Sequence, residues 1–145
     1  MNIDNIQLLH LQVADTKITT SDEFKYSDVE VAYVDYGNSA TYGFVEEENL
    51  VNLALSLTLD GYDENDKEAG THAAFRIEFL FEVDDLEAHL KNDTDGKVLS
   101  SQLVLTLAGI AYSTARGLVY DRLQGSAMEN SLLPVIEASE IFEEE

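Results

Sequence analysis

The longest stretch without a charged side chain constrains this protein most. It runs from Val98 to Ala115 and ends at Arg116, in a chain with 29 acidic and 8 basic residues and a formal net charge of -21. Its length just reaches that of a membrane span, about 18 residues. However, the stretch contains several serines and threonines. A helix inserted in the bilayer could also not cover the sheet, so one apolar face of the sheet would be exposed to water. We therefore expect a buried helix.

The segment from Ser100 or Ser101 to about Gln124 is predicted to form this helix. Either serine can cap its start, and Gly125 is a usual C-terminal stop. Apolar side chains surround nearly the whole circumference, which indicates burial on more than one side. We expect the chain's own sheet on one side and a neighbouring subunit on the other. The residues predicted at this oligomer interface are Leu107, Ala108, Ala111, Tyr112 and Ala115.

Period-two alternation predicts an antiparallel sheet in the first half of the chain. Val51–Leu59 and Thr71–Val83 alternate apolar and polar residues and flank the polar segment Asp60–Gly70, which is typical of a hairpin. Further strands are expected at Ile6–Ala14 and Val29–Tyr36, and Gly37–Glu48 is expected to be a turn and an edge segment with Tyr42 and Phe44 partly exposed. The predicted fold class is α+β, a four-stranded antiparallel sheet followed by one long helix.

The end of the chain predicts two short elements. Pro134 cannot continue a helix from upstream, so Leu132–Ile136 is expected to be extended. Glu137–Glu145 is expected to form a short helix that presents Ile141 and Phe142. The length of 145 residues fits a single domain, 1–145.

Composition narrows the classes of partner. The chain has no cysteine, and its N-terminus lacks the features of a signal peptide, so we expect a cytoplasmic protein. The excess of acidic residues repels nucleic acid and anionic membrane surfaces. It suits a positively charged or unfolded polypeptide, although acidity that only maintains solubility is an equal alternative.

No motif for catalysis or metal binding is present. The hydrolase elbow, the dinucleotide-binding loop and the P-loop are all absent. Lys91–Gly96 fails as a calcium loop because Lys91 takes the first ligand position, so we predict an Asp-rich turn before the helix. The remaining candidate groups lack catalytic spacing: His10, His72 and His89, and the loop residues Asp84, Asp85 and Glu87. We expect no enzyme, no metal and no cofactor.

Three segments together resemble the SecB family of protein-export chaperones. They are AFRIEFLFEV in the fourth strand, AGIAYSTARGLVYDRLQG in the long helix, and SLLPVIEASEIF in the linker and last helix. The resemblance implies a homotetramer, a dimer of dimers, that holds unfolded polypeptides in apolar grooves without ATP and passes preproteins to the SecA motor of the Sec translocase.

The resemblance also implies binding residues. In the family the long helix, the loop crossing between the first two strands and the final helix, acting as a lid, line the groove. The positions implied for client binding are Ile18, Phe24 and Tyr26 in the crossing loop, and Leu133, Ile136, Ile141 and Phe142 in the linker and lid. Contact with a SecA-like partner is implied for Glu30 and Glu78.

Departures from the family pattern leave other functions open. Ile136 stands where the family has asparagine, the last helix is short, and the tail that also touches SecA is expected to be missing. A SecB-like adaptor or assembly protein with one dedicated partner, for example an antitoxin-type chaperone, is therefore the alternative function. A small-molecule enzyme on an α+β scaffold is a third hypothesis, motivated only by the carboxylate-rich loops.

Overall fold

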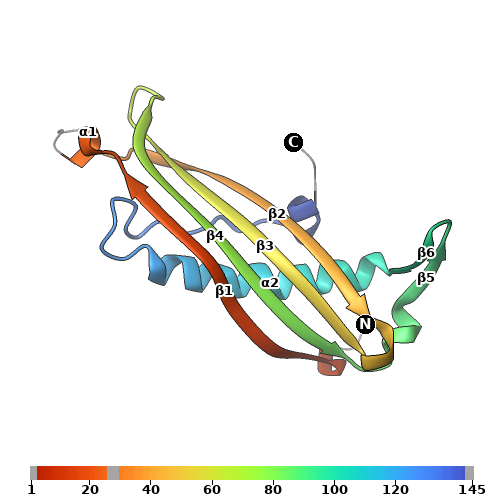
Figure 1. Ribbon diagram of the computed structural model, residues 1–145. Helices are drawn as coiled ribbons and strands as arrows, with labels where there is room; N and C mark the ends of the chain where they lie inside the picture. The colour runs from red at the N-terminus through yellow and green to blue at the C-terminus, as the bar shows by residue number, and fades with distance from the viewer. Residues whose placement is uncertain (1–2, 26–29, 143–145) are drawn as a thin grey trace.

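The computed structural model describes residues 3–25 and 30–142. Four long strands form one antiparallel sheet, and a single long helix crosses one face of it (Figure 1). The strands are β1 (Ile6–Thr20), β2 (Tyr33–Val45), β3 (Leu50–Tyr62) and β4 (Glu68–Val83), and the helix is α2 (Ser101–Arg122). The α+β class, with a four-stranded sheet followed by a long helix, is confirmed.

Shorter elements lie at the ends of the sheet and of the helix. They are the helix α1 (Asp22–Lys25), the strands β5 (Leu90–Asp93) and β6 (Gly96–Leu99), and the 3₁₀ helices η1 (Ile3–Asn5), η2 (Glu46–Glu48), η3 (Leu86–His89) and η4 (Ala138–Phe142). The order across the large sheet is β1-β4-β3-β2, so β1 and β2 are its edges and the chain crosses from one edge to the other between them. Helix α1 lies at the same end of the sheet as the β3–β4 loop (Figure 1).

Both edge strands are longer than the sequence predicts. β1 continues past Ala14 to Thr20. β2 runs from Tyr33 to Val45, so it starts later than predicted and ends later; residues 30–32 are not part of the strand, and Val29 lies outside the described residues. The turn expected at Gly37 is wrong, because β2 continues through this residue to Val45. Gly37 pairs with Thr58, and a Cβ at position 37 would lie 2.5 Å from the Thr58 Oγ1. The glycine thus accommodates a neighbouring side chain within a strand.

The alternation in β3 and β4 separates a buried face from a polar one. The buried face, which packs against α2, consists of Val51, Leu53, Leu55, Leu57 and Leu59 on β3 and Ala73, Phe75, Ile77, Phe79, Phe81 and Val83 on β4. Each large apolar side chain buried in this way contributes about 1.5–3 kcal/mol, so this face supplies a large part of the core. The predicted β3–β4 hairpin is confirmed, with register pairs from Leu50–Glu82 to Tyr62–Glu68.

Helix α2 begins and ends close to the predicted positions. The Ser100 Oγ accepts a hydrogen bond from the Leu103 N–H at 3.3 Å and caps the first turn. After Arg122 the chain turns, and Gly125 has a φ of 84°, in the left-handed region that favours glycine. Within the described residues α2 is the helix whose length and composition would allow a membrane span, and 44% of its apolar window is buried inside the fold.

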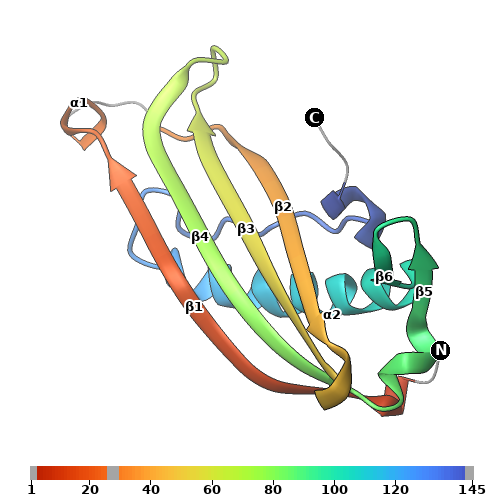
Figure 2. The ribbon, with the colours of Figure 1, turned by 45° about the vertical axis from the view of Figure 1, so that its right-hand side comes forward.

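The predicted oligomer-interface residues are buried within the single chain, so that assignment is wrong. Leu107, Ala108, Ala111, Tyr112 and Ala115 have exposed fractions of 0–5%. The reason is that α2 has two intramolecular covers, the sheet and the C-terminal segment that runs back along it (Figure 2). The side of α2 that remains open carries Gln102, Leu105, Ser113, Gly117 and Tyr120.

The Asp-rich turn before α2 is part of a small hairpin that was not predicted. Strands β5 and β6 pair with each other from Leu90–Leu99 to Asp93–Gly96, in a separate two-stranded sheet. Gly96 has a φ of 124°, which suits the tight turn. The hairpin projects from the N-terminal end of α2 (Figure 2).

The C-terminal segment agrees with its prediction. Residues 131–137 have no regular structure, and η4 follows with Ile141 buried and Phe142 half-buried. η4 contacts both α2 and β2. This places the end of the described chain over the edge strand of the sheet (Figure 1).

Candidate peptide-binding groove

An apolar groove lies where α2, β2, η4 and the end of β6 meet. Its volume is about 340 Å³, and it is lined by Tyr42, Leu99, Ser101, Val104, Leu105, Ser139 and Phe142. The floor is closed, since Leu99 and Val104 are only 5% and 8% exposed. The rim is open: Tyr42 and Leu105 are 44% and 37% exposed. A groove of this kind presents apolar surface to a ligand without unfolding the core.

Two aromatic side chains form one wall of the groove. The rings of Tyr42 on β2 and Phe142 on η4 meet edge to face, with centroids 6.1 Å apart and planes at 88°. Such an arrangement stabilises a pair by about 0.5–1.5 kcal/mol beyond its burial. Because one partner belongs to the sheet and the other to the last described element, this contact ties η4 to the edge of the sheet.

Two polar side chains of α2 hold the linker that leads to η4. The Tyr112 hydroxyl donates a hydrogen bond to the Pro134 carbonyl at 2.7 Å, and the Arg116 Nε donates one to the Leu133 carbonyl at 2.9 Å. Burial raises the pKa of Tyr112 above its usual value, and the nearby Arg116 charge opposes this in part. Arg116, which closes the uncharged stretch, therefore anchors the linker.

The residues implied for client binding divide into two groups at different places. Leu133 and Ile141 are 2% exposed and belong to the core, whereas Ile136 and Phe142 are half-buried. Among these four, Phe142 alone lines the groove. The two buried residues hold the lid in place and have no surface to offer a client.

The other group lies at the crossing between the two edges of the sheet. Ile18 is half-buried on β1, Phe24 is half-buried on α1, and Tyr26 lies outside the described residues. Phe24 packs beside the start of β4, where a Cβ built on Gly70 would be 3.5 Å from the Phe24 Cβ. Neither Ile18 nor Phe24 lines the groove.

Of the seven lining residues, the sequence-based client-binding set contained Phe142 and missed six: Tyr42, Leu99, Ser101, Val104, Leu105 and Ser139. Tyr42 was expected to be partly exposed, but not as part of a binding surface. Leu105 stands in a helix that is apolar on all sides, so its spacing alone does not separate a groove residue from a core residue. Leu99 is placed by the β5–β6 hairpin, which had no clear sequence signal.

The outer face of the sheet is mixed in charge. Glu78 lies on this face, 3.7 Å from the Arg76 Nε, at a hollow of about 350 Å³ that His10 and Gln12 also line. Glu30 is exposed but precedes β2, so it lies outside the sheet. The two glutamates implied for a SecA-like partner therefore do not share one acidic strand surface.

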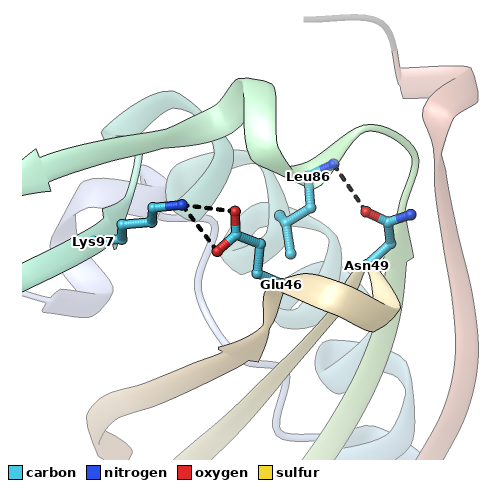
Figure 3. A network of polar contacts seen from close by, with 4 residues as sticks. All are labelled: Glu46, Asn49, Leu86 and Lys97. Carbon is cyan, nitrogen blue, oxygen red and sulfur yellow. Dashed lines mark hydrogen bonds and ion pairs between the residues drawn. The ribbon is translucent and has the colours of Figure 1, made fainter.

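Acidic side chains are also present on two elements next to the groove, η2 and η4. Glu46, Glu47 and Glu48 form η2 at the end of β2, and Glu137 and Glu140 flank the start of η4. Lys97 on β6 pairs with Glu46, and the Asn49 Oδ1 accepts a hydrogen bond from the Leu86 N–H at 3.1 Å (Figure 3). Within residues 3–25 and 30–142, no group of three metal-binding side chains comes together.

Comparison with known proteins gives a match in structure but none in sequence. No protein family profile matches the chain, and no curated protein matches it. The fold matches that of the SecB-like chaperone Rv1957 of Mycobacterium tuberculosis, solved in complex with a ChAD peptide from the HigA1 antitoxin Rv1956. The TM-score is 0.63 at 14% identity, over 92% of this chain and 91% of the other. The chain has a SecB-like fold.

The SecB-like fold agrees with the resemblance read from the sequence. The structural match extends over nearly the whole chain, although the sequence identity is low. The sheet has the strand order β1-β4-β3-β2. The long helix lies on one face of this sheet, and the C-terminal segment lies beside the helix (Figure 2).

Proposed function

We propose that this protein is a SecB-like chaperone that holds an extended segment of an unfolded or disordered polypeptide in the groove beside α2, without ATP. The observation that carries the proposal is the groove itself, with Tyr42 and Leu105 exposed above a closed apolar floor. A passive binder of this kind needs apolar surface and no catalytic group. The acidic residues around the groove favour a client with positive charge.

A dedicated partner is favoured over general protein export. The similar Mycobacterium tuberculosis chaperone was solved with a peptide from an antitoxin, and the two proteins share their fold. In addition, the outer sheet face is not uniformly acidic, because it carries Arg76, His10 and His72. The family resemblance implies that an export chaperone contacts SecA through an acidic sheet face. General holding of preproteins for SecA, in the cytoplasm, is the second candidate.

Assembly into a homotetramer, a dimer of dimers, is part of the same proposal. The start of edge strand β1 leaves Leu8 and Leu9 37% and 44% exposed, and Leu11 and Val13 are only half-buried. A second copy would cover this apolar edge. Light scattering at micromolar concentration is expected to give four times the chain mass of 16.1 kDa, and a monomer mass would contradict the assembly.

Client binding is tested with an unfolded chain of positive charge, namely reduced and carboxamidomethylated ribonuclease A carrying a fluorescent label. Fluorescence anisotropy is expected to show binding by the unmodified protein. Leu105→Glu places a charge in the apolar groove and is expected to weaken binding about tenfold or more. Loss of binding should occur without loss of the folded state, because Leu105 is 37% exposed.

Gln102→Glu is the matched control. Gln102 is exposed one turn earlier on the same helix and does not line the groove, so this variant adds the same charge elsewhere. Binding is expected to stay within about twofold of the unmodified value, as for other surface substitutions. An added negative charge does not repel a positively charged client, so equal weakening by both variants would mean that the groove does not determine binding.

Partner range is tested by purification of the tagged protein from its source cells. One dominant companion that Leu105→Glu fails to retain supports a dedicated partner. Many unrelated export precursors, retained by the unmodified protein and lost with Leu105→Glu, would support the general export chaperone instead.

A further inference from the structure

The β5–β6 hairpin forms one end of the groove but is not part of the large sheet. It pairs with no strand of the large sheet, and a two-stranded hairpin of four-residue strands is marginally stable alone. Its last residue, Leu99, is 5% exposed and lines the groove next to Val104 and Leu105. A shift of β6 would therefore move a wall of the groove.

The described side-chain ion pair that joins this hairpin to the large sheet is Lys97–Glu46. The Lys97 Nζ donates hydrogen bonds to both carboxylate oxygens of Glu46, at 2.9 and 3.1 Å (Figure 3). Lys97 lies on β6, two residues before Leu99, and Glu46 directly follows β2. The pair thus connects the strand that ends at Leu99 with the strand that supplies Tyr42.

The surroundings of Lys97 favour this connection. The pKa of Lys97 is raised above its usual value, first by its hydrogen bond to Glu46 and then by the charge of Glu46. The charges of Glu87 and Glu47 act in the same direction. Glu46 is in direct contact with the ammonium group, and two further carboxylates stabilise its charge from a greater distance. On the other side of the same β2–β3 turn, the Asn49 side chain accepts a hydrogen bond from the Leu86 N–H. The turn therefore contacts both the segment that precedes β5 and the strand β6.

We propose that Lys97 and Glu46 are positioning residues for client binding: their ion pair fixes the β5–β6 hairpin as the end wall of the groove, although neither side chain lines it. This inference rests on the proposed function. It predicts that a bound segment is held less tightly when the pair is broken, because Leu99 is then free to move. It also predicts that salt, which screens exposed charges, reduces the contribution of the pair.

The test uses the full chain and the labelled ribonuclease A described above. Lys97→Met is expected to weaken binding about two- to fivefold, the range for a partly exposed ion pair, mainly through faster dissociation. The difference between this variant and the unmodified protein should shrink as salt is raised. Glu46→Gln should weaken binding to a similar extent, and the double variant Lys97→Met with Glu46→Gln should bind no more weakly than either single variant, a result that two independent losses of stability would not give.

Lys91→Met is the matched control. Lys91 lies on β5 of the same hairpin, pairs in register with Val98, and forms no ion pair among those of the described residues. It removes one positive charge from the same hairpin, so it separates the ion pair from the net charge. Its binding is expected to equal that of the unmodified protein or to be slightly tighter, since the client is positively charged.

Three results would overturn the inference. They are equal binding by the Lys97→Met and Lys91→Met variants, additive weakening by Lys97→Met and Glu46→Gln in the double variant, and a Lys97→Met effect that is independent of salt. Each of these requires that the unmodified protein binds, so they leave the proposed function standing. Absence of binding by the unmodified protein would instead overturn the proposed function and this inference with it.

Discussion

The two sides of α2 both lack charged side chains from Ser101 to Ala115 but have different surroundings. On the buried side, Ala111, Ala115 and Val119 are 0% exposed. On the open side, Leu105 and Tyr120 are 37% and 39% exposed, and Ser113 and Gly117 are exposed between them. On the proposed function, the absence of charge from the first four turns of α2 has a different cause on each side. One side has to exclude charge because it is core, and the other leaves apolar surface available for binding.

The largest difference between the two sides is expected from an added charge. Ala111→Asp places an unpaired carboxylate among side chains of the core and should destabilise the fold by at least about 3 kcal/mol. Ser113→Asp, two residues away on the open side, should change the free energy of unfolding by less than about 0.5 kcal/mol. Urea denaturation followed by circular dichroism measures both. Similar values for the two variants would mean that the sides are not distinct.

A smaller difference is expected when the leucines on the two sides are shortened. Leu103 is 0% exposed, and Leu103→Ala should cost about 2–5 kcal/mol through lost burial and the cavity it leaves. Leu105→Ala should cost under about 1 kcal/mol, because its side chain is already partly in water. Thermal unfolding of the two variants checks this order, and a reversed order would contradict the assignment of the sides.

Much of this arrangement is predictable from the sequence. The strict alternation in β3 and β4 and the length of α2 follow from local patterns, because the periods of 2 and 3.6 residues leave a direct trace in hydrophobicity. Ser100 and the Leu-Pro-Val linker also have local signals. The edge strands are harder to predict, since half of their surface is exposed and Gly37 resembles a turn residue.

The candidate groove is predictable only in part, because it depends on long-range contacts. Leu133 and Leu105 are both leucines in apolar segments, yet one closes the core and the other lines the groove. What separates them is the path of the C-terminal linker along α2. That path is determined by Tyr112 and Arg116, whose partners lie more than a dozen residues away in the chain.

The C-terminal linker covers part of the buried side of α2, so weakening its attachment should expose the linker and that part of the helix to solvent. Arg116→Met removes the hydrogen bond to the Leu133 carbonyl and is expected to cost about 1–2 kcal/mol, because a half-buried carbonyl loses a charged donor. Hydrogen exchange should rise in residues 131–142 and stay unchanged in β3 and β4. Equal increases in all three regions would indicate global unfolding rather than release of the linker.

The smallest expected effect is that of the Tyr112 hydroxyl, and it depends on pH. Tyr112→Phe removes the 2.7 Å hydrogen bond to Pro134 and should cost about 1 kcal/mol at neutral pH. The pKa of Tyr112 is raised by burial above its usual 10.0, so the folded state keeps this proton longer than the unfolded state. The associated stability is therefore fully present below pH 10.0 and declines as the pH rises through the higher folded pKa.

The difference in stability between the unmodified protein and Tyr112→Phe should therefore be constant from neutral pH to about pH 9.5 and narrow above it. Tyr120→Phe is the control on the open side, where the hydroxyl donates to Asn130 at 3.2 Å near the surface. It should cost less than Tyr112→Phe at neutral pH, because its hydroxyl lies near the surface. An equal cost for the two variants would show that the linker does not divide a buried side of α2 from an open one.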